Sequence, residues 1–471
     1  MVSKIFLSTF LISVFLVSIA YSFYFQIQPM VDAKAYDAIA QNIVAGNGYR
    51  ESVDVPLADD NAIMRVGPGY EFFLAFVFFL FGHSYVAVWI IQALLHSLTA
   101  LLTFLTAREV FGVYHKEWEK DDVSFFVDGA SGTSRAWLIG VVTATLVGFS
   151  PDLITMQGML MTETLGIFLT MLSIYLFFNV LNTGRGGGFL WWCQWALVAF
   201  VLALATLVRT PSVLLALPMG GYLLWQRQWK IIATMSVVGI LVFVPWTVRN
   251  YRIYHAFVPT NLAYGIDLAA GNHPGATGEL EPYAKNDEYI EKLGPVEGNK
   301  RLVQETFNFI STQPLEFLKI TARRVSIYFS FARPTGFWFH LSGFSKITAL
   351  VASSIYAFIL FTFGFWGIAV FLKEYFKRNT TTPQRDNNRA LLLFGMLLMM
   401  PLAIIPIIVE TRYRMPVYPF FALFAGFGFQ KLREKQKCLT CFALVVFLVL
   451  ANTAFDMLNN IDRILERISN L

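Results

Sequence analysis

The chain has 471 residues, of which 56% are hydrophobic and 14% are charged, and its formal net charge at pH 7 is +5. A composition this apolar excludes an ordinary soluble globular protein and indicates a polytopic membrane protein. The basic residues cluster between apolar segments instead of forming one continuous face, so no nucleic-acid partner is expected.

Eleven segments approach the roughly 20 apolar residues that a helix needs to cross a bilayer. The first is longer than the core of a signal peptide, so we interpret it as a retained transmembrane helix. A further run, 71–82, would reach only about 18 Å as a helix, and we expect it to be re-entrant or interfacial. The eleven predicted spans are 5–25, 84–107, 136–150, 163–181, 190–208, 211–225, 231–247, 346–372, 391–409, 415–430 and 438–455.

Charge distribution supports this count. With eleven spans and the N-terminus inside, every inside loop carries lysine or arginine, as the positive-inside rule requires. If 71–82 were a full span, the basic segments 373–390 and 431–437 would lie outside. We therefore expect an integral all-α membrane protein with about 11 transmembrane helices, in contact with membrane lipids. Its expected parts are a transmembrane module 1–248 with a first outer loop 26–83, a large outer loop 249–345 with amphipathic helices, and C-terminal transmembrane helices 346–471.

The first outer loop opens with the stretch "VDAKAYDAIAQNIVAGNGYR", residues 31–50. Its apolar residues recur at helical spacing, which predicts an interfacial helix with Asp32 at its N-terminus. Asp32 is either the N-cap of that helix or a functional carboxylate at the membrane surface. We interpret Lys34 and Asp37 as surface residues.

A second polar cluster, "MRVGPGYEFF", places Arg65 before a Gly-Pro-Gly turn. Arginine at a membrane boundary commonly anchors lipid headgroups. The alternative is a phosphate clamp, since the planar guanidinium suits a phosphate well.

Three more polar clusters follow at predicted outer ends. Asp152 and Glu163 flank a short loop, although Glu163 at a helix start could simply complement the helix dipole. Arg249 and Asn250 lead into a loop rich in glycine, asparagine and histidine, and "ETRYRMPVYP" supplies the last cluster. All five clusters fall on one side of the membrane, which predicts a polar site there for a ligand with anionic and hydroxylated parts, such as a lipid carrying a phosphorylated sugar.

The sequence resembles the GT-C-fold glycosyltransferases that use polyprenyl-phosphate-linked sugars, a group that includes protein O-mannosyltransferases and aminoarabinose transferases. The matching motifs are "DAKAYDAIAQNIVAGNGY", "RVGPGYEFFLAFVFFLFG", "SPDLITMQGMLMTETL", "PWTVRNYRIYHAFVPTN" with "GNHPGATGE", and "RYRMPVYP". They occur in the family's order over residues 1–430. The resemblance implies a bacterial or archaeal cytoplasmic membrane, with the active site on the extracytoplasmic face.

Carried over by position, the resemblance makes Asp32 the acidic residue that activates the acceptor, and it makes Arg65 the basic residue before the proline turn, which would face the donor phosphate. Asp152 or Glu163 would be the family's second acidic position, which helps to hold a metal in some relatives. No cofactor is certain, and a divalent metal stays an open question. The family often has Lys-Pro-Pro where this chain has Arg-Val-Gly-Pro, which leaves the acceptor class open.

The expected reaction displaces a polyprenyl phosphate from a sugar in one inverting step, with a carboxylate as base and arginines at the leaving phosphate. The acceptor would be a lipid, a glycan or a protein. A lipid or anionic-solute transporter is the alternative, but nearly charge-free span interiors and the lack of a visible repeat favour the enzyme. For His273 a structural role in its loop is favoured over a catalytic one. Besides Arg65, the candidate phosphate ligands are Arg249, Arg412 and Arg414, and the candidate substrate contacts are Tyr36, Tyr70, Asn250, Asn272, His273 and Tyr413.

Overall fold

The computed structural model describes residues 2–116, 133–182, 187–332, 339–378, 387–434 and 439–461. Within these ranges the regular elements are helices, and the only β contact is an isolated bridge between Glu279 and Val409. The all-α prediction is therefore confirmed. Parts of the predicted inside loops, including 379–386 and 435–438, lie outside the described residues.

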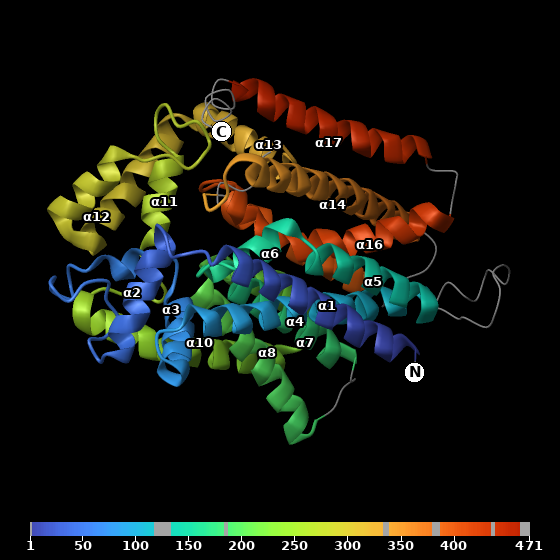
Figure 1. Cartoon of the computed structure of the whole chain (residues 1–471), viewed down its shortest axis with the longest axis horizontal. Helices are drawn as coiled ribbons and strands as arrows, with labels where there is room; N and C mark the ends of the chain where they lie inside the picture. The colour runs from blue at the N-terminus through green and yellow to red at the C-terminus, as the bar shows by residue number, and fades with distance from the viewer. Residues whose placement is uncertain are drawn as a thin grey trace.

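The long helices lie roughly side by side across the molecule (Figure 1). In the described residues, seven helices are long and apolar enough to cross a membrane, or eight if α5 (Thr133–Gly148) and α6 (Pro151–Gln157), bent by 54°, form one span. An integral membrane protein follows from these lengths. The seven are α1 (Val2–Phe25), α4 (Tyr85–Lys116), α7 (Thr162–Asn182), α8 (Phe189–Val208), α10 (Trp229–Tyr254), α14 (Gly343–Arg378) and α17 (Leu439–Asn459).

The remaining predicted spans form shorter helical segments. They are η3 (Thr210–Leu215) with α9 (Ala216–Trp225), α15 (Asn387–Ile404), and α16 (Tyr418–Glu434). Every predicted span thus contains a helix, but the count of eleven crossings is not confirmed. α16 is largely buried against α5 and α14. Glycines allow this close approach: a Cβ at Gly367 in α14 would lie 1.9 Å from the Phe424 carbonyl oxygen.

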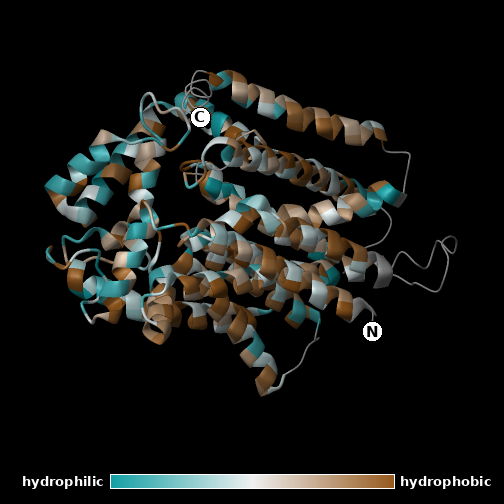
Figure 2. Ribbon diagram, viewed as in Figure 1, coloured by the Kyte–Doolittle hydropathy of each residue, from teal (hydrophilic) through white to brown (hydrophobic). Residues whose placement is uncertain are grey.

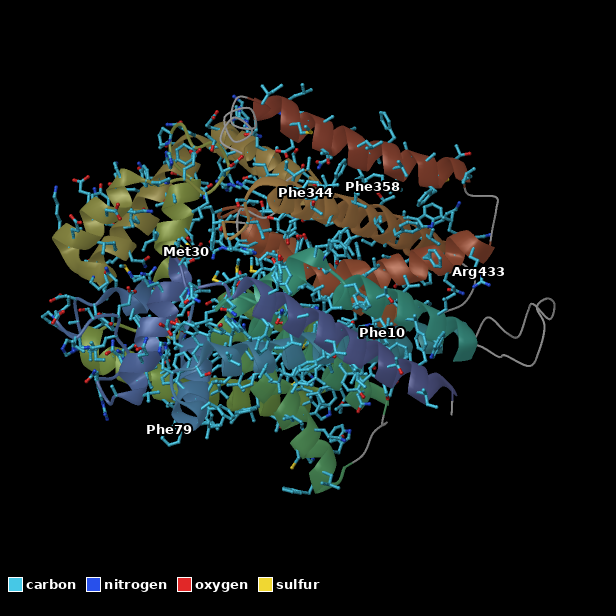
Figure 3. All side chains as sticks on the ribbon, in the orientation of Figure 1. Phe10, Met30, Phe79, Phe344, Phe358 and Arg433 are labelled. Carbon is cyan, nitrogen blue, oxygen red and sulfur yellow. The ribbon has the colours of Figure 1, made fainter. Side chains whose placement is uncertain are left out.

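Helices other than the predicted spans gather at one end of the bundle, at the left of Figure 1. They include α2 (Asp32–Val44), α3 (Pro68–Phe81), α11 (Ala263–Gly271) and α12 (Ala284–Thr312). Figure 2 shows hydrophilic residues concentrated there, whereas the long helices are mainly hydrophobic. In Figure 3, Met30 lies near this end and Arg433 at the opposite end.

Three further elements complete this end of the molecule: η1 (Asn61–Met64), α13 (Pro314–Phe329) and η4 (Thr411–Val417). The expected short run is α3, which has 14 residues and exposes Phe76 and Phe79. α12 contains a kink at Gly294, whose φ of 77° suits glycine. The described part of the predicted outer loop 249–345 therefore consists mainly of helices.

Asp37 corrects one prediction. It is not a surface residue, because its side chain is buried and accepts hydrogen bonds from Gln41 and from the Tyr85 hydroxyl at 2.9 Å. His83 Nε2 lies 2.8 Å from its other oxygen. Asp37 faces the start of α4 from α2, and a pattern read along α2 alone does not reveal partners more than 40 residues away. Lys34 is exposed as predicted.

Candidate active site

Asp32 lies at the centre of a cluster of charged residues. The N-cap alternative is wrong: Asp32 is the first residue inside α2, and Val31 holds the cap position. Val31 has φ +51°, a conformation that is costly for a β-branched residue. The Asp32 carboxylate pairs with Arg412 Nη1 at 2.9 Å and with Arg65 Nη1 at 3.6 Å. Residues far apart in sequence thus meet at this carboxylate.

Arg65 is held in place by two features. Glu51 accepts hydrogen bonds from its Nε at 2.6 Å and its Nη2 at 3.0 Å, the two-point geometry typical of arginine and carboxylate. The turn after Arg65 packs tightly on the end of α8, where a Cβ at Gly67 would lie 2.3 Å from the Leu207 carbonyl oxygen. This close approach explains why glycine follows Arg65 so closely in the sequence.

Arg412 comes from η4 and is only 7% exposed. Its Nε donates to Glu410 at 2.7 Å, and its guanidinium carbon lies 5.1 Å from the centre of the Tyr413 ring. Burial opposes the charge of Arg412, but Tyr413 and the carboxylates of Glu410, Glu163 and Asp32 raise its pKa well above the ordinary value. Arg412 is therefore a cation held at the junction of several acids.

A buried ion pair forms the inner wall of this cluster. Glu163, in the first turn of α7, is 1% exposed, and its Oε1 lies 2.6 Å from Arg209 Nη1. Arg209 also donates to Thr162 and lies 5.9 Å from the Tyr413 ring centre. The structure thus connects Glu163 to the Arg412 segment through Arg209 and Tyr413.

Asp267 in α11 is influenced by the charges of the same cluster. Burial raises its pKa from the ordinary 3.8 to about 6; Arg412 and Arg209 lower it, whereas Asp32 and Glu410 raise it. Glu51, Arg209 and Asp267 were not among the residues predicted from sequence. The signals were weak: Arg209 separates two apolar runs, and Asp267 is a single acid in the mainly apolar stretch between Asn261 and Gly271.

Asp152 and Arg414 belong to a second cluster, deeper in the protein. Asp152 is fully buried, and it accepts hydrogen bonds from Ser353 and from Tyr418 Oη, the latter at 2.7 Å. Arg414 Nε donates in turn to Tyr418 at 3.0 Å, and its Nη1 donates to the Ser330 carbonyl. This arrangement joins α6, α14 and α16, and its charged groups lie away from solvent.

Arg249 and Asn250 connect the end of α10 to neighbouring loops. Arg249 donates to Asn250 Oδ1 and to the Tyr49 carbonyl, each at 2.9 Å, and packs on the Trp246 ring. Asn250 donates to the Val258 carbonyl at 2.8 Å. The contacts of these two side chains are thus with the loops and aromatic rings around α10.

Two other predicted substrate contacts, Tyr36 and Tyr70, are buried and pack edge to face with ring centres 5.7 Å apart. Tyr70 donates to Gln92 at 2.9 Å. Asn272 is buried, whereas His273 is partly exposed and stacks on Tyr283. Of the predicted substrate contacts, Tyr413 is the one that packs directly against Arg412.

Arg324 in α13 fixes the loop that leads to η4. It is fully buried, and its Nη1 donates to Asn272 Oδ1 at 3.1 Å and to the Pro406 carbonyl at 3.0 Å. Its Nη2 donates to the Gly271 carbonyl. Burial lowers the pKa of Arg324 to about 10. One side chain thus joins the end of α11 to the segment before Glu410.

The acids of the Asp32 cluster are arranged around arginines. In the part of the chain that the structure describes, no three His, Cys, Asp or Glu side chains form a group suited to a metal ion. The described side chains therefore provide no assembled metal-binding set, and the chemistry that they offer is that of carboxylates beside guanidinium groups.

No protein-family model matches the sequence, and comparison with curated proteins gives no match. Solved structures do resemble the chain. The oligosaccharyltransferase of Archaeoglobus fulgidus, tethered to an acceptor peptide containing the NVT sequon, aligns with a TM-score of 0.50 at 14% identity, over 95% of this chain and 55% of that one. ArnT from Cupriavidus metallidurans, bound to undecaprenyl phosphate, aligns with a TM-score of 0.40 at 15% identity, over 91% of this chain and 78% of that one.

The chain spans about half the length of the oligosaccharyltransferase that it matches. At such low identity the likeness concerns the fold, and the GT-C fold predicted from the sequence motifs is confirmed. Function does not follow from a shared fold and has to be argued from the site.

Proposed function

We propose that this protein is a membrane glycosyltransferase that moves a sugar from a polyprenyl-phosphate-linked donor to an acceptor hydroxyl. The reaction takes place at the extracytoplasmic face of the cytoplasmic membrane. The observation that carries the proposal is the meeting of Asp32 with Arg65 and Arg412 at the polar end of a membrane helix bundle. The likeness to an oligosaccharyltransferase supports the same general kind of reaction.

In this mechanism Asp32 is the general base. The acceptor hydroxyl oxygen attacks the anomeric carbon while its proton passes to the Asp32 carboxylate. The bond between the anomeric carbon and the phosphate oxygen breaks, and the polyprenyl phosphate leaves with the electron pair. A single displacement inverts the anomeric centre, and it requires one base and no enzyme nucleophile.

Arg65 and Arg412 stabilise the negative charge that develops on the leaving phosphate. Arg65 binds Glu51 through Nε and Nη2, and within the described residues its Nη1 lies 3.6 Å from Asp32 Oδ1. A phosphate oxygen can therefore approach Nη1 without displacing Glu51. A phosphate that binds here competes with Asp32 for the arginines, so donor binding releases the carboxylate for its role as base.

Glu163 and Arg209 form the wall behind Arg412, where Glu163 is a positioning residue. Tyr413 contacts both Arg209 and Arg412 and lies where it can also contact substrate. Arg414 and Asp152 support η4 from the buried side. Arg249 stabilises the loops around the site.

The test is transfer by the purified protein, supplied with a panel of polyprenyl-phosphate sugars and with lipid, glycan and peptide acceptors. Asp32→Asn keeps the side-chain shape but removes the base, and we expect the rate to fall by about 10²- to 10⁴-fold. Lys34→Gln, an exposed change on the same helix, is the matched control and should leave the rate unchanged.

Thermal melting shows whether Asp32→Asn still folds. Full activity in a folded Asp32→Asn protein would exclude Asp32 as the base. Movement of the lipid across vesicles without transfer to any acceptor would instead support the transporter alternative.

A further inference from the structure

A cavity of about 470 Å³ lies between α11, the following loop and α12. These helices lie next to each other at the polar end of the molecule (Figure 1). The volume falls within the range of small-molecule binding sites, about 300–1,000 Å³. Asp32, Arg65 and Arg412, the residues of the proposed reaction, do not line this cavity.

The lining offers hydrogen-bonding groups of both kinds. Gln304, Asn308, Thr312 and Gln313 contribute amides and hydroxyls, which both donate and accept hydrogen bonds. His273 and Tyr283 also line the cavity, with ring centres 4.2 Å apart and planes 9° apart. Paired aromatic rings beside amides suit a ligand that has many hydroxyls and apolar C–H faces, which describes a sugar.

The charges in the cavity favour an anion. Glu305 accepts a hydrogen bond from Lys285 Nζ at 2.9 Å, and Arg301 Nε lies 3.3 Å from its other oxygen. Tyr289 also donates to Glu305. One carboxylate thus faces two cations, which leaves one positive charge in excess beside the wall of amide side chains.

We propose that this cavity is a binding site for an acidic saccharide, a sugar unit that carries a carboxylate or a phosphate. The anion would bind Lys285 and Arg301, and the sugar hydroxyls would bind the amides and threonines. The charge of Arg412 acts on Asp267 in α11, whereas Ala269 in α11 and Asn272 and His273 after it line the cavity. That the saccharide is the acceptor of transfer rests on the proposed function, but its binding does not.

Binding is measured by calorimetry on the full chain in detergent, without any sugar donor. The probes are cellobiouronic acid, its neutral counterpart cellobiose, and cellobiose phosphorylated at its terminal sugar. Sodium acetate and sodium phosphate test the anions alone. We expect at least one of the two acidic disaccharides to bind at one site, at least tenfold more tightly than cellobiose or either simple anion. The acidic disaccharide that binds more tightly shows whether the site prefers a carboxylate or a phosphate.

Two variants test the charge argument in opposite directions. Lys285→Gln combined with Arg301→Gln should weaken binding of the acidic disaccharide at least tenfold, since charge-assisted hydrogen bonds are lost. Glu305→Gln should tighten it, because a competing carboxylate is removed. Lys300→Gln is the matched control: Lys300 is exposed on the same helix, pairs with Glu297 and does not line the cavity.

The proposal is overturned if neither acidic disaccharide binds, if cellobiose or a simple anion binds as tightly, or if Glu305→Gln weakens binding in a protein that melts normally. If the full-length protein binds an acidic disaccharide but transfers no sugar to any acceptor, only the proposed function is contradicted. Intact transfer without disaccharide binding would contradict only the cavity proposal.

Discussion

Arg412 and Arg414 are two residues apart in η4, yet they belong to different chemical environments. Arg412 joins Asp32 and Glu410, whose side chains are 21% and 22% exposed. Arg414 reaches the fully buried Asp152 through Tyr418. Both clusters contain an aspartate, an arginine and a tyrosine, but a ligand can reach only the first from solvent. Access, and not composition, distinguishes a candidate reactive cluster from a supporting one.

The largest effect on stability should come from the buried cluster. Arg414→Met leaves Asp152 buried without its cation, and breaking such an arrangement costs about 3–5 kcal/mol of unfolding free energy. Thermal melting of the detergent-purified protein should show a large decrease in Tm. The double variant Asp152→Leu with Arg414→Met should recover part of the loss, because an apolar pair needs no counter-charge. If Arg414→Met melts like the wild type, the claim that the buried cluster supports the fold is contradicted.

Arg412→Lys should affect the rate more than the fold. Lysine retains the charge but loses the planar set of donors, so stabilisation of the leaving phosphate should weaken and transfer should slow by about 10²-fold. Initial-rate measurements should show the change in kcat, with Tm close to that of the wild type. Arg252→Lys, an exposed arginine near the end of α10, is the matched control and should transfer normally. An unchanged rate in Arg412→Lys would contradict the proposal that the Arg412 guanidinium stabilises the leaving phosphate.

Asp267 should make the first cluster sensitive to pH. Burial raises the pKa of Asp267 from 3.8 to about 6, so the folded chain binds this proton more tightly than the unfolded chain. Its contribution to stability therefore falls as pH rises from about 4 to about 6. Asp267→Asn removes this penalty and should be more stable than the wild type at pH 7 by about 1 kcal/mol, a value reduced for partial exposure to water.

Melting curves between pH 4 and pH 7 measure this difference. The gap between Asp267→Asn and the wild type should close near pH 4. Asp287→Asn changes an exposed carboxylate on α12 and should give a gap that does not vary with pH. If the stability difference between Asp267→Asn and the wild type instead widens towards low pH, the claim that the folded protein raises the pKa of Asp267 is contradicted.

The sequence predicted the helices well because a long apolar run in a bilayer must satisfy its backbone hydrogen bonds internally, and a helix does so. It also identified Asp32, Arg65 and Arg412 as candidates, and the structure brings their side chains together. The sequence could not show that Arg414 lies near Asp152, in the buried cluster, and not near Asp32. In a 3-10 segment, a spacing of two residues turns side chains to different sides, and only tertiary packing shows what lies on each side.

Asp37 and Arg209 show the same limit. The burial of Asp37 depends on His83 and Tyr85, and the position of Arg209 depends on Glu163, all of them distant in sequence. Hydrophobic periodicity detects which face of a helix is apolar, but it does not detect a polar side chain that is satisfied by another helix. Such partners require the folded structure.

Arg324 has a consequence for how two ligands would influence each other. It binds Gly271 and Asn272, beside the cavity, and it binds the carbonyls of Ile405 and Pro406, just before Glu410 and Arg412. A ligand that shifts one of these segments changes the energy of the other. Thermodynamic linkage then requires reciprocity: whatever factor the saccharide applies to the affinity for the lipid phosphate, the lipid phosphate applies to the affinity for the saccharide.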